Sequence, residues 1–156
     1  MTTGMMRLRE LTIRYSVKKD GTGRPVAVDR RVGTPAECAA AFNALLHDEP
    51  CEVFGILCLS TKHQVIAYHE VSRGSLDSTL AHPREVFKAA ILANAAAIIL
   101  THNHPSGDPT PSPDDIVLTQ RLVGAGEILG IDVLDHVIIG DGRWVSFRQL
   151  GRLPSS

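Results

Sequence analysis

Blocks of hydrophobic residues predict where the chain forms strands. Residues 52–60 (EVFGILCLS) and 63–72 (HQVIAYHEVS) are rich in β-branched and other apolar residues and flank a short polar turn, which predicts a hairpin. Residues 97–102 (AIILTH) form a short uninterrupted apolar run, which is typical of a buried central strand. Farther along, DVLDHVIIG, the turn DGR and the residues WVSF predict a closing hairpin.

Three helices are expected between these strands. Thr34 is a suitable N-cap before Pro35, and TPAECAAAFNALLH continues with helical periodicity. The stretch HPREVFKAAILANA predicts a second helix, which tolerates Pro83 in its first turn. A third helix begins in SPDDIVLTQRLVGAGEILG and ends at Gly130. The expected fold class is therefore α/β, a single domain with a mixed central β-sheet flanked by helices.

The N-terminal part of the chain differs from the rest in charge. Residues 9–17 (RELTIRYSV) alternate apolar and polar and predict a strand, and a turn-rich stretch, KKDGTGRP, follows. Residues 1–31 hold eight Lys or Arg against three Asp or Glu, whereas the whole chain has a formal net charge of −1. We expect a basic strand and turn segment at 1–33, a domain at 34–150 and a tail at 151–156.

Composition excludes some classes of protein. A hydrophobic fraction of 44% and a charged fraction of 21% are those of a globular protein. No apolar run approaches the roughly 20 residues that span a bilayer, and the first residues lack the apolar core of a secretory signal. Three cysteines without a framework spacing indicate free thiols. We therefore expect a cytoplasmic protein without a membrane partner.

The stretch LTHNHPSGDPTPSPDD, residues 100–115, holds the candidate chemistry. His102 and His104 are two residues apart at the end of a predicted strand, so both side chains point to one face. A proline-rich loop then leads to Asp115 in the first turn of the third helix, which can return a carboxylate to the same place. Two imidazoles and one carboxylate suit zinc and leave its fourth position for water, with iron or manganese as less favoured metals.

A purely structural interpretation of the same residues exists. Ser112, Pro113 and Asp115 also form a typical helix start, with Ser as N-cap, Pro at the first helical position and an acid three residues after the cap. A histidine pair in a loop is often only polar surface. The spacing alone leaves the two interpretations about equally supported.

The residues resemble a known family. The spacing His102-x-His104, seven residues, Ser112, two residues, Asp115 resembles the JAMM metalloprotease motif of the JAB/MPN superfamily. Together with HPREVFKAAILANAAAIIL before it and LDHVIIG after it, the stretch is similar to the RadC-like bacterial branch, over about residues 34–150. The resemblance implies a fold similar to the cytidine deaminases. It also implies one zinc ion per chain, held by His102, His104, Asp115 and a water molecule that attacks a peptide or isopeptide bond.

The resemblance also implies roles for two further residues. The family has a glutamate at the start of the strand after the first helix, which identifies Glu52 as the general base, with Glu49 as the less favoured alternative. Ser112 would support the oxyanion of a tetrahedral intermediate. Many JAMM enzymes have Ser or Thr between the two histidines, where this chain, like RadC-like proteins, has Asn103. The expected substrate is a protein or peptide of unknown identity.

Other polar residues have more ordinary interpretations. His69 and Glu70 could form a second metal site, but a hairpin surface is the favoured interpretation. Cys51 could act as a nucleophile with a histidine, although no spacing supports it. His82 is expected at a helix start.

Residues near the histidines could steady a ligand imidazole. His136 is expected in the core or beside a ligand, and Asp135 or Asp77 could accept a hydrogen bond from a ligand imidazole. The sequence does not choose between the two acids.

Three rival functions would require other residues or another use of the same ones. A nucleoside deaminase needs H-x-E and P-C-x-x-C, which the chain lacks, and the histidines of HNH nucleases are dispersed rather than consecutive. The remaining alternative is a DNA repair or recombination accessory protein with a nuclease-like or vestigial metal site. Nucleic acid would then bind through basic residues 7–31. The oligomeric state stays open.

Overall fold

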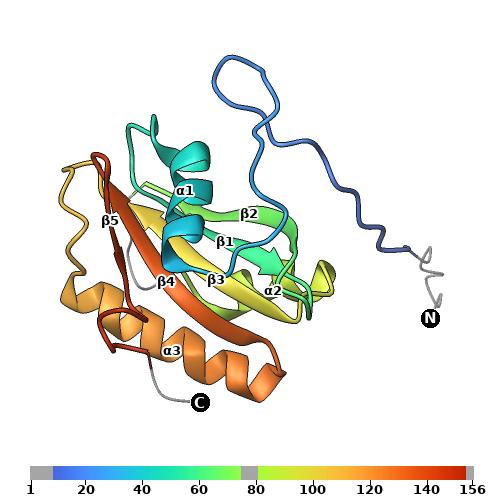
Figure 1. Ribbon diagram of the computed structural model, residues 1–156. Helices are drawn as coiled ribbons and strands as arrows, with labels where there is room; N and C mark the ends of the chain where they lie inside the picture. Colours follow the sequence, from blue (N-terminus) through green and yellow to red (C-terminus); the bar gives the residue numbers. More distant parts are fainter. Residues whose placement is uncertain (1–8, 75–80, 154–156) are drawn as a thin grey trace, which may run out of the picture.

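The computed structural model describes residues 9–74 and 81–153, in which three helices are interspersed among five strands (Figure 1). The five strands form one mixed sheet in the order β2-β1-β3-β4-β5, in which β3 and β4 are parallel and the other pairs antiparallel. The chain thus has the predicted α/β class. The elements in chain order are α1 (Pro35–Leu46), β1 (Val53–Leu59), β2 (Val65–Arg73), α2 (Pro83–Leu92), β3 (Ala97–Asn103), α3 (Pro113–Leu129), β4 (Asp132–Gly140) and β5 (Arg143–Ser146).

The predicted caps explain where two of the helices begin. Thr34 caps α1 in a capping box, in which its hydroxyl accepts from Glu37 N at 3.2 Å and the Glu37 carboxylate accepts from Thr34 N at 2.9 Å. Ser112 and Asp115 form the same box at the start of α3. Gly130 ends α3 with a φ of 69°, a left-handed conformation that favours glycine.

Each face of the sheet carries its own apolar core. On one face, α1 packs through Phe42 against residues of β1 and β3 such as Leu57 and Ile99. On the other face, α2 and α3 pack through Phe87 and Leu122 against the alternate residues of the same strands. Because both faces are covered, every residue of β1 and β3 is buried. The strand that carries the histidine motif is therefore held by packing on both sides.

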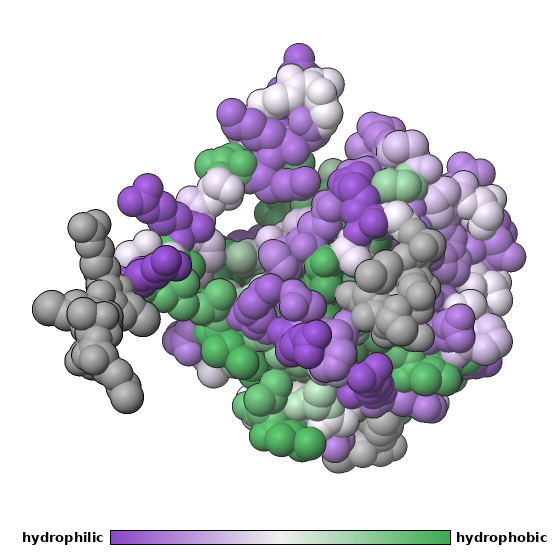
Figure 2. Space-filling view, turned by 180° about the vertical axis from the view of Figure 1, so that it is seen from behind, coloured by the Kyte–Doolittle hydropathy of each residue, from purple (hydrophilic) through white to green (hydrophobic). Residues whose placement is uncertain are grey.

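The predicted strand at residues 9–17 does not form. This stretch has no strand, and the neighbouring chain makes only isolated bridges, Lys19 with Pro25 and Arg31 with Gln64. Its apolar residues stay 50–78% exposed, and Figure 2 shows hydrophobic residues at the surface on this side of the molecule. Alternation predicts a strand with one apolar face, but it does not supply the neighbouring strand that must complete the hydrogen bonds. Of the described helices, none is long and apolar enough to cross a bilayer.

Candidate metal centre

Four polar side chains converge where β3 ends. His102 is the last but one residue of β3, and His104 directly follows the strand, so their Nε2 atoms lie 2.8 Å apart. The first turn of α3 places Asp115 Oδ1 3.3 Å from His102 Nε2 and Asp115 Oδ2 3.5 Å from His104 Nε2. Phe54 of β1 lies opposite His102, and Glu52, two residues before Phe54, reaches the same place. Its Oε1 lies 3.9 Å from His102 Nε2 and 3.8 Å from His104 Nε2.

The convergent side chains are held away from water. The side chains of His102 and Asp115 are 0% and 4% exposed, and that of His104 is 15% exposed. The Glu52 side chain is 25% exposed and forms the rim of the group. Buried polar groups in such a site interact strongly because little water screens them.

Hydrogen bonds outside the group fix which nitrogen of each imidazole carries its proton. His104 Nδ1 lies 2.7 Å from the Asp108 carbonyl oxygen, which only accepts, so Nδ1 carries the proton and donates. The neutral His104 ring therefore presents the lone pair of Nε2 to the site. This is the form in which a histidine binds a metal.

A longer chain of hydrogen bonds gives the same result for His102. The Thr119 hydroxyl donates to the Asp115 carbonyl at 2.7 Å, so its oxygen can only accept from His136 Nδ1 at 2.6 Å. His136 is fully buried, and burial lowers its pKa well below the usual value, which keeps the ring neutral. Its Nε2 then accepts from His102 Nδ1 at 2.8 Å. Consequently, His102 also presents a lone pair at Nε2.

The group therefore consists of hydrogen-bond acceptors that face one another. Two imidazole lone pairs 2.8 Å apart repel each other unless a cation or a proton lies between them. The pKa shifts follow from this arrangement. Hydrogen bonding to Asp115 raises the pKa of His104. Burial by itself would raise the pKa of Asp115, but the imidazoles of His102 and His104 hold it well below its usual range. The site thus attracts positive charge.

The donor set and spacing suit a small divalent metal. Two ligands about 2.0 Å from a tetrahedral zinc lie roughly 3.3 Å apart, close to the separations between Asp115 and the two imidazoles. Glu52, His102 and His104 also offer one ligand atom each within 4.8 Å of one another, and no other such group occurs in the described ranges. Either carboxylate can therefore join the two imidazoles.

Ser112 and Glu49, the other residues with predicted roles, have clear structural partners. Ser112 Oγ accepts from Asp115 N at 3.1 Å, and Asp115 Oδ2 accepts from Ser112 N at 2.8 Å while facing His104. Asp115 therefore takes part both in the capping box of α3 and in the group of acceptors around His102 and His104. The support of an oxyanion by Ser112 stays a prediction. Both carboxylate oxygens of Glu49 bind Arg73, which makes Glu52 the better placed base.

The less favoured candidates remain outside the group. Glu70 binds Arg73 through both carboxylate oxygens, and the Arg73 guanidinium also lies 3.6 Å from Cys51 Sγ. His82 caps α2 by accepting from Arg84 N at 3.2 Å, as expected of a helix start. Asp77 lies outside the described residues.

His136, expected in the core or beside a ligand, is the hydrogen-bond partner of the His102 imidazole. Asp135 instead accepts from Ser146 Oγ at 2.6 Å and from the backbone nitrogens of His136 and Arg148. Thr119, at the end of the chain of hydrogen bonds, belongs to no motif in the sequence. It follows Asp115 by four residues, so helical spacing was the available signal.

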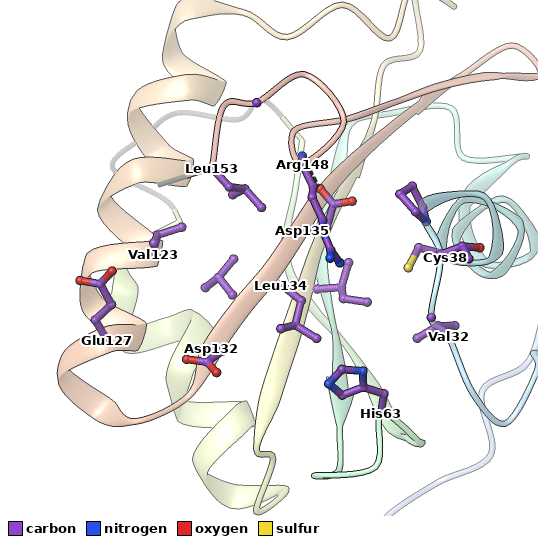
Figure 3. Close-up of a pocket in the computed structure, with 16 residues that line it drawn as sticks. Val32, Cys38, His63, Val123, Glu127, Asp132, Leu134, Asp135, Arg148 and Leu153 are labelled. Atoms are coloured by element: carbon purple, nitrogen blue, oxygen red, sulfur yellow. Dashed lines mark hydrogen bonds between the residues drawn. The ribbon is translucent and has the colours of Figure 1, made fainter. Parts of the chain in front are cut away.

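One hollow lies where β3 and β4 end, and another lies along β4. The first, of about 560 Å³, is lined by His104, Asn103 and Pro105 among others, but not by Glu52, His102 or Asp115. The other, of about 670 Å³, lies along β4 beside α1 (Figure 3). Its labelled residues include Cys38 and Asp135, and none of the four convergent side chains lines it. Of these two hollows, only the first includes one of the four convergent residues, His104.

Several known proteins are similar in sequence to most of this chain. A family model described as the RadC-like JAB domain matches residues 32–152. A UPF0758 protein of Methanosarcina barkeri is 47% identical over 122 residues, which cover 78% of this chain and 53% of that protein. A UPF0758 protein of Desulforudis audaxviator is 47% identical over 148 residues, or 95% of this chain and 64% of that protein. The chain spans well under two thirds of the length of most of these relatives, and for one from Moorella thermoacetica, 64% identical over 98 residues, it spans 43%. On the family match and these identities, the chain belongs to the RadC-like JAB domain family.

Proposed function

We propose that this chain is a zinc-dependent hydrolase of the JAMM type that cleaves a peptide or isopeptide amide bond. The observation that carries the proposal is the pair of Nε2 lone pairs of His102 and His104, 2.8 Å apart, with the Asp115 carboxylate within 3.5 Å of both. Neutral imidazoles and a carboxylate are the ligands of catalytic zinc sites that keep one position open. Membership of a family related to the JAMM proteases supports the same reaction.

In this proposal the residues divide into ligands and groups that handle protons and charge. His102, His104 and Asp115 hold the zinc. A bound zinc ion would polarise the amide carbonyl and lower the pKa of water to about 7. Glu52, at the exposed rim, takes a proton from the attacking water and delivers it to the leaving amine. The Ser112 hydroxyl donates to the developing oxyanion.

The hollow beside His104 supports a peptide-like substrate. Its volume of about 560 Å³ is that of an ordinary ligand site, and its lining combines apolar residues such as Leu46 and Pro50 with polar ones such as His47 and Asp141. We propose that it receives the part of the substrate next to the cleaved bond. Its residues do not specify one sequence, so the substrate class is protein or peptide.

Metal content is the first test. Protein purified without added metal is expected to contain one zinc per chain, measured by mass spectrometry of the elements, and His104→Ala is expected to contain little. Glu52→Gln is expected still to bind one zinc per chain, although more weakly, because Glu52 is not among the three proposed ligands. Wild-type protein with far less than one zinc per chain, even after incubation with zinc, would exclude the proposed function.

Cleavage is the second test. A library of internally quenched peptides and isopeptide-linked lysines is expected to yield a zinc-dependent substrate, and Glu52→Gln is expected to lower kcat by at least about 100-fold, the usual contribution of a general base. Glu127→Gln, which changes an exposed carboxylate on α3, is the matched control and should keep wild-type activity. Equal activity of Glu52→Gln and Glu127→Gln would refute the role of Glu52.

A further inference from the structure

Asn103, the residue between the two histidines, makes hydrogen bonds that have no part in the reaction proposed above. Successive side chains of a strand point to opposite faces, so Asn103 points away from the face that carries His102. It is 5% exposed and therefore needs partners for its amide. Its Oδ1 accepts from Val53 N at 2.7 Å, and its Nδ2 donates to the Cys51 carbonyl oxygen at 2.9 Å.

These two hydrogen bonds lie on either side of Glu52. Cys51 precedes Glu52 in the chain and Val53 follows it, so one amide side chain holds the peptide groups at both ends of this residue. The bonds form where the backbone register between β1 and β3 ends, at Phe54 opposite His102. The Asn103 side chain therefore continues the connection between the two strands by one more residue, up to the residue that carries the carboxylate.

The remaining attachments make this connection rigid. On the other side of β1, the Glu52 carbonyl oxygen accepts from Gly74 N at 2.8 Å. Asn103 itself is paired with Ile139 of β4, and His104 N donates to the Ile139 carbonyl oxygen at 2.8 Å. The main chain at Glu52 is thus fixed relative to the same strand end that carries both imidazoles.

We propose that Asn103 is a positioning residue that sets the place of the Glu52 carboxylate relative to the metal centre. The inference rests on the proposed function, because it gives Glu52 the role of base beside a zinc ion. An amide is required, since the side chain must donate to one peptide group and accept from the other at once. Aspartate at neutral pH accepts from Val53 N but has no proton for the Cys51 carbonyl oxygen.

Hydrogen exchange at the Val53 amide tests the contact itself. Asn103→Ala removes the acceptor of this N–H, so its exchange is expected to become at least tenfold faster, whereas Asn103→Asp keeps the acceptor and should protect the amide better than alanine does. Thr101→Val is the matched control, because Thr101 is fully buried on the same face of β3 and its hydroxyl has no partner. Unchanged exchange at Val53 in Asn103→Ala, with cooperative unfolding retained, would overturn the proposal.

Zinc affinity, measured by competition with a chelator, tests whether Asn103 acts through Glu52. Loss of the Glu52 charge beside the imidazoles is expected to raise the zinc dissociation constant, and changes of residues that support a metal site typically do so by about 10- to 100-fold. Asn103→Ala should raise the zinc dissociation constant by a similar factor. The double variant Asn103→Ala/Glu52→Gln should raise it by no more than the more damaging of the two single changes does. Independent, multiplying effects of the two changes would show that Asn103 does not act through Glu52.

The two measurements separate this inference from the proposed function. If the wild-type chain bound no zinc, the proposed function would fail, and exchange at Val53 would still decide whether Asn103 supports the backbone at Glu52. If zinc bound and the two substitutions had independent effects on its dissociation constant, the hydrolase proposal would stand and the positioning role of Asn103 would be refuted. Thr101→Val should keep the wild-type zinc affinity in either case.

Discussion

At His102 and His104, hydrogen bonds to residues outside the candidate metal centre determine which ring nitrogen faces its centre. The Asp108 carbonyl oxygen keeps the proton of His104 on Nδ1. The hydrogen bonds through His136 to Thr119 do the same for His102. Both rings thus offer a lone pair at Nε2 without a change of tautomer when a cation arrives. The site is ready for a metal because its imidazoles are already in the binding form.

The pKa of His104 leads to a prediction about pH. The Asp115 carboxylate raises this pKa above the ordinary value of 6.5, so a proton competes for the His104 lone pair at a pH where a free histidine is mostly neutral. Zinc affinity is therefore expected to fall as the pH drops through the raised pKa, by about tenfold per pH unit below it. Chelator competition between pH 8 and pH 5 measures this; a dissociation constant that stays level down to pH 6 would contradict it.

Single residues were predictable from the sequence where their spacing is local. The pair His102 and His104, and the timing of Asp115 in the first helical turn, follow from the periods of strands and helices. The contact between His136 and Thr119 joins α3 to β4 across 17 residues of sequence, and it depends on how these two elements pack. No local pattern contains that information, so the sequence could offer His136 as a residue of the core or beside a ligand but could not predict its hydrogen bonds to His102 and Thr119.

Among the elements, the predicted strands and helices formed where caps or buried neighbours supported them. The helix starts at Thr34 and Ser112 and the end at Gly130 were predictable because capping is decided within a few residues. The prediction of a strand at 9–17 was wrong, although apolar and polar residues alternate there as regularly as in a true strand. A strand also needs a neighbour, and the sequence gives no sign of which segment, if any, supplies one.

Two glycines of α3 offer a matched prediction about how that helix packs. A Cβ at Gly126 would lie 2.4 Å from the Ile131 carbonyl oxygen, so Gly126→Ala is expected to destabilise the chain by about 1–3 kcal/mol through overpacking. A Cβ at Gly124 would meet no atom within 4 Å, so Gly124→Ala should stabilise the helix by up to about 1 kcal/mol. Urea unfolding of both variants measures the difference, and equal midpoints would refute this account of the contact between α3 and β4.

The whole molecule is a covered sheet to which the N-terminal segment is only loosely joined. Residues 9–31 contribute one bridge to the sheet, between Arg31 and Gln64, and a backbone hydrogen bond from Val65 N to the Arg30 carbonyl oxygen. The segment carries the excess of basic residues that suggested a nucleic-acid partner. Folding and any binding of nucleic acid should therefore be separable.

Removal of residues 1–29 tests this separation. The shortened chain is expected to unfold cooperatively at a temperature within about 5 °C of the full chain, since the loss of a few partly buried contacts such as those of Val28 costs roughly 1 kcal/mol. Any salt-sensitive binding of DNA by the full chain should disappear with the segment, while zinc content stays the same. Loss of cooperative unfolding, seen by circular dichroism, would show that the segment belongs to the folded domain.

The parallel pairing of β3 and β4 has a consequence for where the chain can grow. Because both strands end at the same edge of the sheet, the turn after β4 lies against the loop that carries His104, and a Cβ at Gly140 would come within 2.8 Å of the Gly107 carbonyl oxygen. Arg143 also donates to that carbonyl oxygen at 2.9 Å. Extra residues inserted between β4 and β5 would push directly on the histidine loop. The turn between β1 and β2 lies at the opposite end of its strands, so it is the safer position for a tag or an added peptide.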